Sequence, residues 1–175
     1  IDSVGIITAN TGINVVANGI NVQAGILTAK NIIDASDAQG NTRVGGNAGN
    51  SFSGTNATYN TLIGYDAGTA ITTGDSNIAV GAYALDANTT GSHNTAIGFE
   101  CLGANTTASY NTAVGRYSMK VNTTGNDSVA IGAYTLAANT TASENTAVGG
   151  NALGANTTGI NNTGFGYGSL SANTT

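Results

Sequence analysis

Apolar and polar positions recur along most of this chain with a period of 17 residues. Counted from the Asn that opens each copy, positions 2 and 4 are mostly Thr, Val or Ile, and position 9 is mostly Leu. Position 5 is Gly in all seven copies. These glycines are Gly64, Gly81, Gly98, Gly115, Gly132, Gly149 and Gly166. A short fixed period indicates a repeat fold in which each copy buries its apolar face by stacking on its neighbours.

The alternation within each copy predicts β-structure. Positions 2 and 4 form one face of a short strand, and positions 9 and 11 form a second apolar face with the same two-residue period. Helices are disfavoured because Gly, Asn and Thr recur too often and no apolar stripe has helical spacing. We therefore predict an all-β fold, a parallel β-solenoid or β-roll of 17-residue coils. Each coil is expected to hold two strands, closed by Gly or Asn corners.

Three regions follow from the repeat boundaries. Residues 60–175 hold seven copies, the last of them incomplete. Residues 1–33 carry Gly followed by β-branched residues at a shorter spacing of six or seven, which predicts a narrower β-repeat segment. Residues 34–59 form a transition, in which Asn41–Gly45 is a degenerate copy of the repeat start. The chain lacks an initiator Met and stops within a repeat, so we expect it to be a piece of a longer protein.

Position 12 forms a column of asparagines. Identical residues of stacked coils lie above one another, so these side-chain amides are expected to pair from coil to coil. The asparagines in question are Asn88, Asn105, Asn122, Asn139 and Asn156.

Charge is scarce and unevenly distributed. Only 7% of residues are charged, the net charge is −5, and four Lys plus Arg form no basic stripe, so we expect no nucleic-acid partner. No apolar run is long enough for membrane insertion. The single Cys101 stands in a column of small residues and the single His93 in a variable one, which gives no catalytic pair. We accordingly predict no enzyme activity, no cofactor site and no metal site.

Positions 1 to 5 carry no charge in any of the seven copies. Position 3, on the strand face opposite to positions 2 and 4, is almost always Ala and is expected to point outward. An outward face that is small and uncharged favours cover by another chain. We therefore predict an oligomer, with a homotrimer preferred, in contact through this column. The candidate interface consists of Ala79, Ala96, Ala113, Ala130 and Ala147.

Position 7 gathers aromatic residues at Tyr83, Tyr117 and Tyr134, interrupted by Glu100. An exposed aromatic strip can bind the apolar faces of sugar rings, which makes these tyrosines a candidate surface contact. The alternative is that they stack along the rod and cover alanine-rich surface.

Two resemblances bear on function. The NTAVG and SVAIG cores, of which Ser128–Gly132 is the clearest, resemble head repeats of trimeric autotransporter adhesins, although the period here is longer. The opening segment DSVGIITANTGINV resembles fibre-like structural proteins of marine myoviruses, which also contain NTAIG-type arrays. The combination implies a homotrimeric fibre of the phage type.

The function expected from this resemblance is a structural shaft segment of a phage tail fibre or virion appendage that supports host attachment. Other virion or fibre proteins and a host-surface glycan or protein are the implied partners, and the virion tail fibre is the implied location. The alternative is the head or stalk of a bacterial trimeric adhesin at the cell surface. An ice-binding β-solenoid is disfavoured, because such surfaces carry Thr-x-Thr whereas this chain repeats Asn-Thr-Thr.

Overall fold

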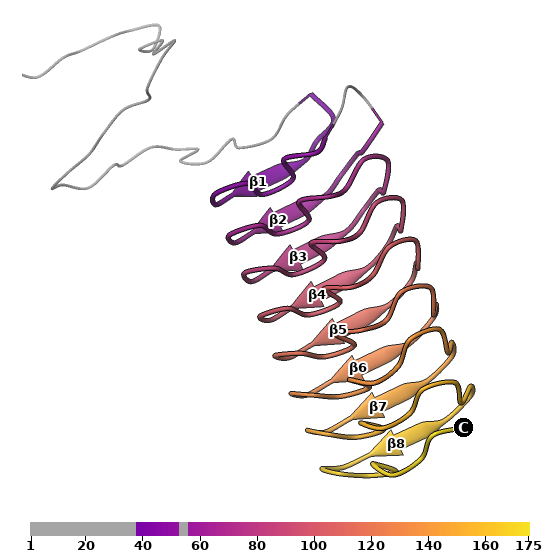
Figure 1. Cartoon of the computed structure of the whole chain (residues 1–175). Helices are drawn as coiled ribbons and strands as arrows, with labels where there is room; N and C mark the ends of the chain where they lie inside the picture. Colours follow the sequence, from indigo (N-terminus) through magenta and orange to yellow (C-terminus); the bar gives the residue numbers. More distant parts are fainter. Residues whose placement is uncertain (1–37, 53–55) are drawn as a thin grey trace, which may run out of the picture. The chain divides into compact units, whose positions relative to one another are not determined.

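The computed structural model describes residues 38–52 and 56–175, which form a parallel eight-stranded sheet. Neighbours in the sheet are neighbours in the sequence, so each strand is reached after one turn of the coil (Figure 1). The strands are β1 (Thr42–Val44), β2 (Thr61–Ile63), β3 (Ile78–Val80), β4 (Thr95–Ile97), β5 (Thr112–Val114), β6 (Val129–Ile131), β7 (Thr146–Val148) and β8 (Thr163–Phe165). The predicted all-β solenoid of 17-residue coils is confirmed. The predicted short-period segment 1–33 lies outside the described residues.

The register stacks identical repeat positions. Ala96 pairs with Ala113 and Thr95 with Thr112, and the same correspondence holds for the other coils. The degenerate copy obeys it too, because β1 pairs in parallel with β2 although their leading asparagines are 19 residues apart. The two additional residues are therefore accommodated outside the strand.

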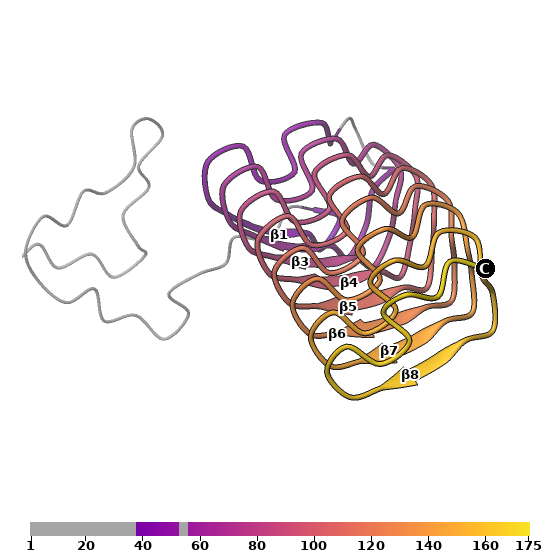
Figure 2. The ribbon, with the colours of Figure 1, turned by 60° about the horizontal axis from the view of Figure 1, so that its bottom comes forward.

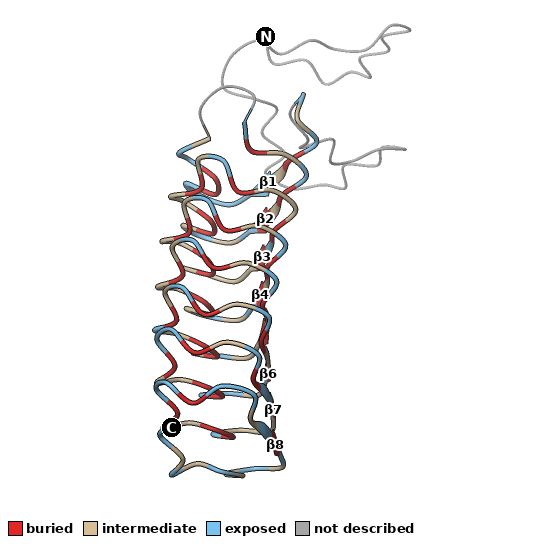
Figure 3. Ribbon diagram, turned by 90° about the vertical axis from the view of Figure 1, so that its right-hand side faces the viewer, coloured by how far each residue is buried: buried red, intermediate tan, exposed pale blue. Residues whose placement is uncertain are grey.

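The core is a narrow column between the sheet and the opposite wall of the coil (Figures 2 and 3). It is built from position 3 of the strand and from positions 8 and 9 of the return segment. Ala113, Ser118 and Met119 hold these places in one coil, and all three are fully buried. Only small residues fit opposite Leu or Met in so thin a section, which accounts for the alanine at position 3.

Each described coil contains one β-strand, so the prediction of two strands per coil was wrong. The return segment has left-handed backbone at two alternate positions, represented by Tyr117 (φ 59°) and Met119 (φ 49°). An extended strand cannot include such residues. The segment nevertheless joins its neighbours through backbone hydrogen bonds, such as that from Leu102 N to Ser118 O at 3.0 Å.

The left-handed residue at position 9 explains how the leucine column is buried. The prediction placed positions 9 and 11 on one face, but position 9 points into the core whereas position 11 is partly exposed, with Val121 36% exposed. A period-two pattern thus came from turns rather than from a strand.

The glycine column is required by both conformation and space. Gly98 has φ +137°, and a Cβ added to it would lie 2.6 Å from the carbonyl oxygen of Gly115 in the next coil. That conformation is essentially restricted to glycine, and the approach leaves no room for a methyl group. The predicted structural role of this column is supported.

The predicted asparagine ladder at position 12 is confirmed. Asn105 Nδ2 donates to Asn88 Oδ1 at 2.8 Å and also to the carbonyl of Ala108 at 3.0 Å. Equivalent pairs continue through Asn122, Asn139 and Asn156. Because every one of these amides is buried, each bond satisfies a polar group that water cannot reach.

A second ladder at position 1 was not predicted. Asn77 Nδ2 donates to Asn60 Oδ1 at 3.0 Å and to the carbonyl of Gly91 at 2.9 Å, so it ties two coils and closes its own corner. The leading Asn is thus a structural residue in these coils. Its recurrence in six of the seven copies, with Ser128 as the exception, was the signal that could have revealed this second ladder.

In the repeat of residues 60–76, two larger core residues compensate for a glycine at position 9. Where position 9 is Gly68, a Cβ on that residue would meet the side chains of Leu62 and Ile71 at 2.8 and 2.9 Å. Leu62 stands at the alanine position and Ile71 at the asparagine position, and both are fully buried. The two larger residues therefore fill the space that leucine takes in later coils.

Candidate interaction surfaces

The alanine column lies inside the protein, which corrects its assignment as a contact between chains. Ala79, Ala96, Ala113, Ala130 and Ala147 are each 0% exposed and belong to the core of their own chain. Position 3 does lie on the opposite strand face from positions 2 and 4, but it is position 3 that faces the core and positions 2 and 4 that face outward. The larger β-branched residues point outward because the thin interior has room only for the methyl group of alanine.

The outer face of the sheet is therefore made of positions 2 and 4. All of its residues on β1 to β8 are Thr, Val, Ile or Phe, so the face carries no charge. Ile78, Ile97 and Ile131 are 39–41% exposed in the chain taken alone. At ~4.8 Å per strand, the face extends for roughly 34 Å along the stack. Position 4 is Val, Ile or Phe in every strand, so it forms an apolar stripe along the face beside a position-2 column that is mostly Thr. An apolar stripe that runs along a whole face is typical of an interaction site.

A second surface is a strip of five aromatic rings along the coil axis. Tyr65, Tyr83, Phe99, Tyr117 and Tyr134 follow one another with ring centroids 5.2–5.9 Å apart. The first three contacts are edge-to-face and the last is tilted, which are favourable geometries for aromatic pairs. The alternative in which the tyrosines stack along the rod is thus supported.

The continuity of this aromatic strip was not predicted from the sequence. Glu100 interrupts the tyrosine column at position 7, but Phe99 at position 6 of the same coil contacts both Tyr83 and Tyr117. Tyr65 extends the strip in the same way from position 6 of its own coil. The strip combines residues of positions 6 and 7. The sequence does not show that these two positions meet at one corner of the coil, so the structure is needed to join them.

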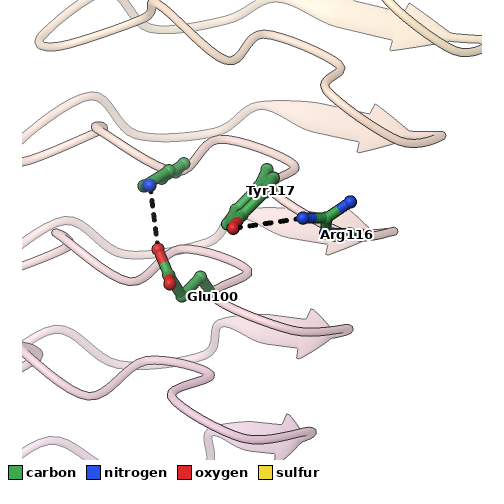
Figure 4. Close-up of polar contacts among 4 residues, drawn as sticks. Glu100, Arg116 and Tyr117 are labelled. Atoms are coloured by element: carbon green, nitrogen blue, oxygen red, sulfur yellow. Dashed lines mark hydrogen bonds and ion pairs between the residues drawn. The ribbon is translucent and has the colours of Figure 1, made fainter.

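Charged groups gather on this strip. Lys120 Nζ lies 2.9 Å from Glu100 Oε2, the only ion pair among residues 38–52 and 56–175, and 4.4 Å from the Tyr117 ring centroid (Figure 4). Arg116 lies over the same ring at 4.4 Å and donates from Nη2 to Tyr117 Oη at 3.3 Å. Both cations are thereby engaged with the strip.

A groove of about 330 Å³ opens beside the strip. Its lining combines ring, alkyl and charged groups from three consecutive coils. The lining residues are Tyr83, Asp86, Glu100, Gly103, Ala104, Lys120 and Val121. Asp86, Gly103 and Lys120 all occupy position 10, so the absent side chain of Gly103 leaves a gap between an acid and a base.

The Asp86 carboxyl is partly withdrawn from water in this groove. Burial raises its pKa above the usual value, hydrogen bonds from backbone amides oppose that effect, and the negative charges of Glu100 and Asp66 raise the pKa further. The carboxylate is thus a hydrogen-bond acceptor with reduced hydration.

The threonine columns form a third surface. Thr106 Oγ1 at position 13 donates to the carbonyl of Thr123 in the next coil at 3.2 Å, whereas Thr107 at position 14 is exposed. The same bond from position 13 is made by Thr72, Thr89, Thr123 and Thr157, so most coils use one threonine hydroxyl within the stack and leave the position-14 threonine exposed.

The only cysteine of the chain lies in the core, and the described residues include no cluster suited to a metal ion. Cys101 is fully buried, its Sγ contacts the carbonyl of Ala113 at 3.2 Å, and burial raises the thiol pKa to about 12. Within residues 38–52 and 56–175, no cluster of three His, Cys, Asp or Glu side chains is suited to a metal ion. The same residues include no helix with the length and apolar character needed to cross a membrane.

No protein-family model matches the chain, and comparisons with curated proteins and with solved structures also give no match.

Proposed function

We propose that this chain is a structural segment of a homotrimeric fibre, of the phage tail-fibre type that its sequence resembles. Its role is to hold host-attachment elements away from the particle, together with other fibre or virion proteins. The observation that supports the proposal best is the uncharged apolar outer face of β1 to β8, which remains exposed although the chain has a closed core of its own.

The face suits a second and third copy of the same chain. Every coil presents an uncharged pair of side chains at the same two positions, Thr, Val or Ile on β1 to β7 and Thr with Phe on β8, so copies in register repeat a similar contact along the stack. Burial of these side chains contributes roughly 25 cal/mol per Å² of apolar surface. The number three comes from the resemblance to trimeric fibres.

The mechanism is mechanical. Parallel backbone bonds between all coils and two buried asparagine ladders oppose the separation of any one coil. Contact between chains would cover the exposed sheet face as well. Such a rod resists proteolysis and pulling because local opening must break several interactions at once.

The test is the molar mass in solution, by light scattering after size exclusion. We expect three times the chain mass of 17.1 kDa. Ile97→Asp, which places a charge on the exposed sheet face, is expected to reduce the mass to that of a single folded chain. Thr107→Asp adds the same charge to an exposed site elsewhere in the same coil and serves as the matched control.

A monomeric parent chain would overturn the proposal. A dimer would overturn the trimer, and equal assembly of the parent and Ile97→Asp would show that the sheet face is not the contact. Circular dichroism of each variant distinguishes lost assembly from lost folding.

A further inference from the structure

We propose that the groove beside the aromatic strip binds a neutral saccharide. The inference rests on the proposed fibre function, for which it supplies a ligand class: an uncharged sugar unit of a host-surface glycan. The groove volume of about 330 Å³ lies at the lower end of the range for small-molecule sites. That size suits a monosaccharide or a disaccharide unit.

The lining matches the two-sided chemistry of a sugar ring. A pyranose has an apolar C–H face and a rim of hydroxyl groups. Tyr83, Ala104 and Val121 supply apolar surface, while the carboxylates of Asp86 and Glu100 accept hydrogen bonds from hydroxyl groups. Hydrogen bonds to charged acceptors are the stronger class, so this polar rim can orient the ring.

The charges favour a neutral ligand over an acidic one. Two carboxylates and one ammonium give the lining a net formal charge of −1. Lys120 is already paired with Glu100 and lies over the Tyr117 ring, and Arg116 is engaged with the same ring. No uncommitted cation in the groove is therefore present to attract a sugar carboxylate.

The groove belongs to a particular part of the stack. Gly103 stands between Asp86 and Lys120 in the position-10 column, and its φ lies outside the left-handed region that would require glycine. A Cβ at this position would lie 3.4 Å from Asp86 Oδ1, so a longer side chain would occupy the groove. The backbone conformation therefore does not require glycine at position 103. The role that the structure gives to this glycine is to keep the groove open.

The experiment is saturation-transfer NMR on the full chain. The probes are the methyl glycosides of glucose, galactose, mannose and N-acetylglucosamine, with sialic acid as the anionic comparison. We expect transfer to at least one neutral glycoside and weaker transfer to sialic acid. Asp86→Asn should weaken the affinity at least tenfold, and Gly103→Leu should abolish binding by filling the groove.

Two variants outside the groove are the controls. Tyr110→Ala removes an exposed ring that stacks on His93, and Asp127→Asn removes an exposed carboxylate, so both should bind like the parent. Absence of transfer to every neutral glycoside would overturn the proposal. Tighter binding of sialic acid, or parental binding by both groove variants, would also overturn it.

Molar mass measured on the same samples separates the two proposals. A trimer that binds no sugar contradicts the groove alone. A monomer that binds a neutral glycoside contradicts the fibre and leaves the groove in place.

Discussion

Gly98 and its counterparts in the other coils carry two constraints at once. The chain turns there with a backbone conformation that side chains disfavour, and the next coil passes so close that a Cβ on Gly98 would lie 2.6 Å from the carbonyl oxygen of Gly115. Position 9 also combines an unusual backbone conformation with close packing, since Leu102 has φ 50° and is fully buried. A left-handed non-glycine residue costs about 1–2 kcal/mol, which burial of the leucine side chain offsets.

Gly98→Ala is expected to destabilise the protein by at least ~2 kcal/mol, because it adds strain at φ +137° and forces two coils apart. Thermal unfolding followed by circular dichroism measures the effect. Gly103→Ala in the same coil is the matched control, because its Cβ would meet its nearest neighbours at an ordinary 3.4 Å. Equal melting temperatures for the two variants would contradict this explanation of the glycine column.

The Cys101 thiol is expected to resist alkylation in the folded protein. Burial raises its pKa from 9.0 to about 12, so between these values the folded thiol stays protonated while an unfolded thiol ionises. At pH 8 the thiolate fraction is lower by about three orders of magnitude. Iodoacetamide labelling, followed by mass spectrometry, should therefore be at least that much slower in native than in urea-denatured protein. Comparable rates in the two states would show that the thiol is accessible.

At the scale of one coil, strand pairing and the two asparagine ladders both join the coil to its neighbours. Asn105 uses both side-chain polar atoms, donating to Asn88 and Ala108 and accepting from Asn122 at 3.3 Å. The sequence indicated this ladder because the residue recurs at a fixed position. It could not show which strand face is buried, since alternation groups residues by face without naming the inner one.

Asn105→Ala is expected to cost about 2 kcal/mol, because the buried Asn88 Oδ1 loses its donor, whereas the carbonyl of Ala108 keeps the bond from Asn94 Nδ2. Thr107→Ala in the same coil should change stability by less than ~0.5 kcal/mol, because its side chain is exposed. Denaturant unfolding of both variants measures the difference. A loss below 1 kcal/mol for Asn105→Ala would mean that the ladder contributes little.

At the scale of the described solenoid, stability is distributed over equivalent interfaces between coils. Each strand pairs only with the strand before it and the strand after it. Stacking energies are therefore approximately additive along the axis, and one coil can be removed without changing the geometry of the others.

Deletion of residues 128–144, one whole repeat, is expected to leave a folded protein with a lower unfolding free energy. After the deletion, Asn111 and Asn145 hold position 1 of consecutive coils. The position-1 column, which Ser128 interrupts in the parent chain, is then asparagine throughout. Deletion of residues 128–135 removes half a coil and should abolish cooperative unfolding in calorimetry. Similar unfolding of the two deletions would contradict a stack that depends on the 17-residue register.

The sequence by itself determined the period, the parallel in-register stack and one asparagine ladder, because each follows from recurrence at fixed spacing. Only the tertiary structure decided that alanine faces inward and Ile97 outward, since the width of the coil determines which side chain fits. It also decided that Phe99 bridges Tyr83 and Tyr117, because columns one residue apart meet only where the corner brings them together. The uncharged strand noticed in the sequence thus presents its β-branched face, and not its alanines, to the exterior.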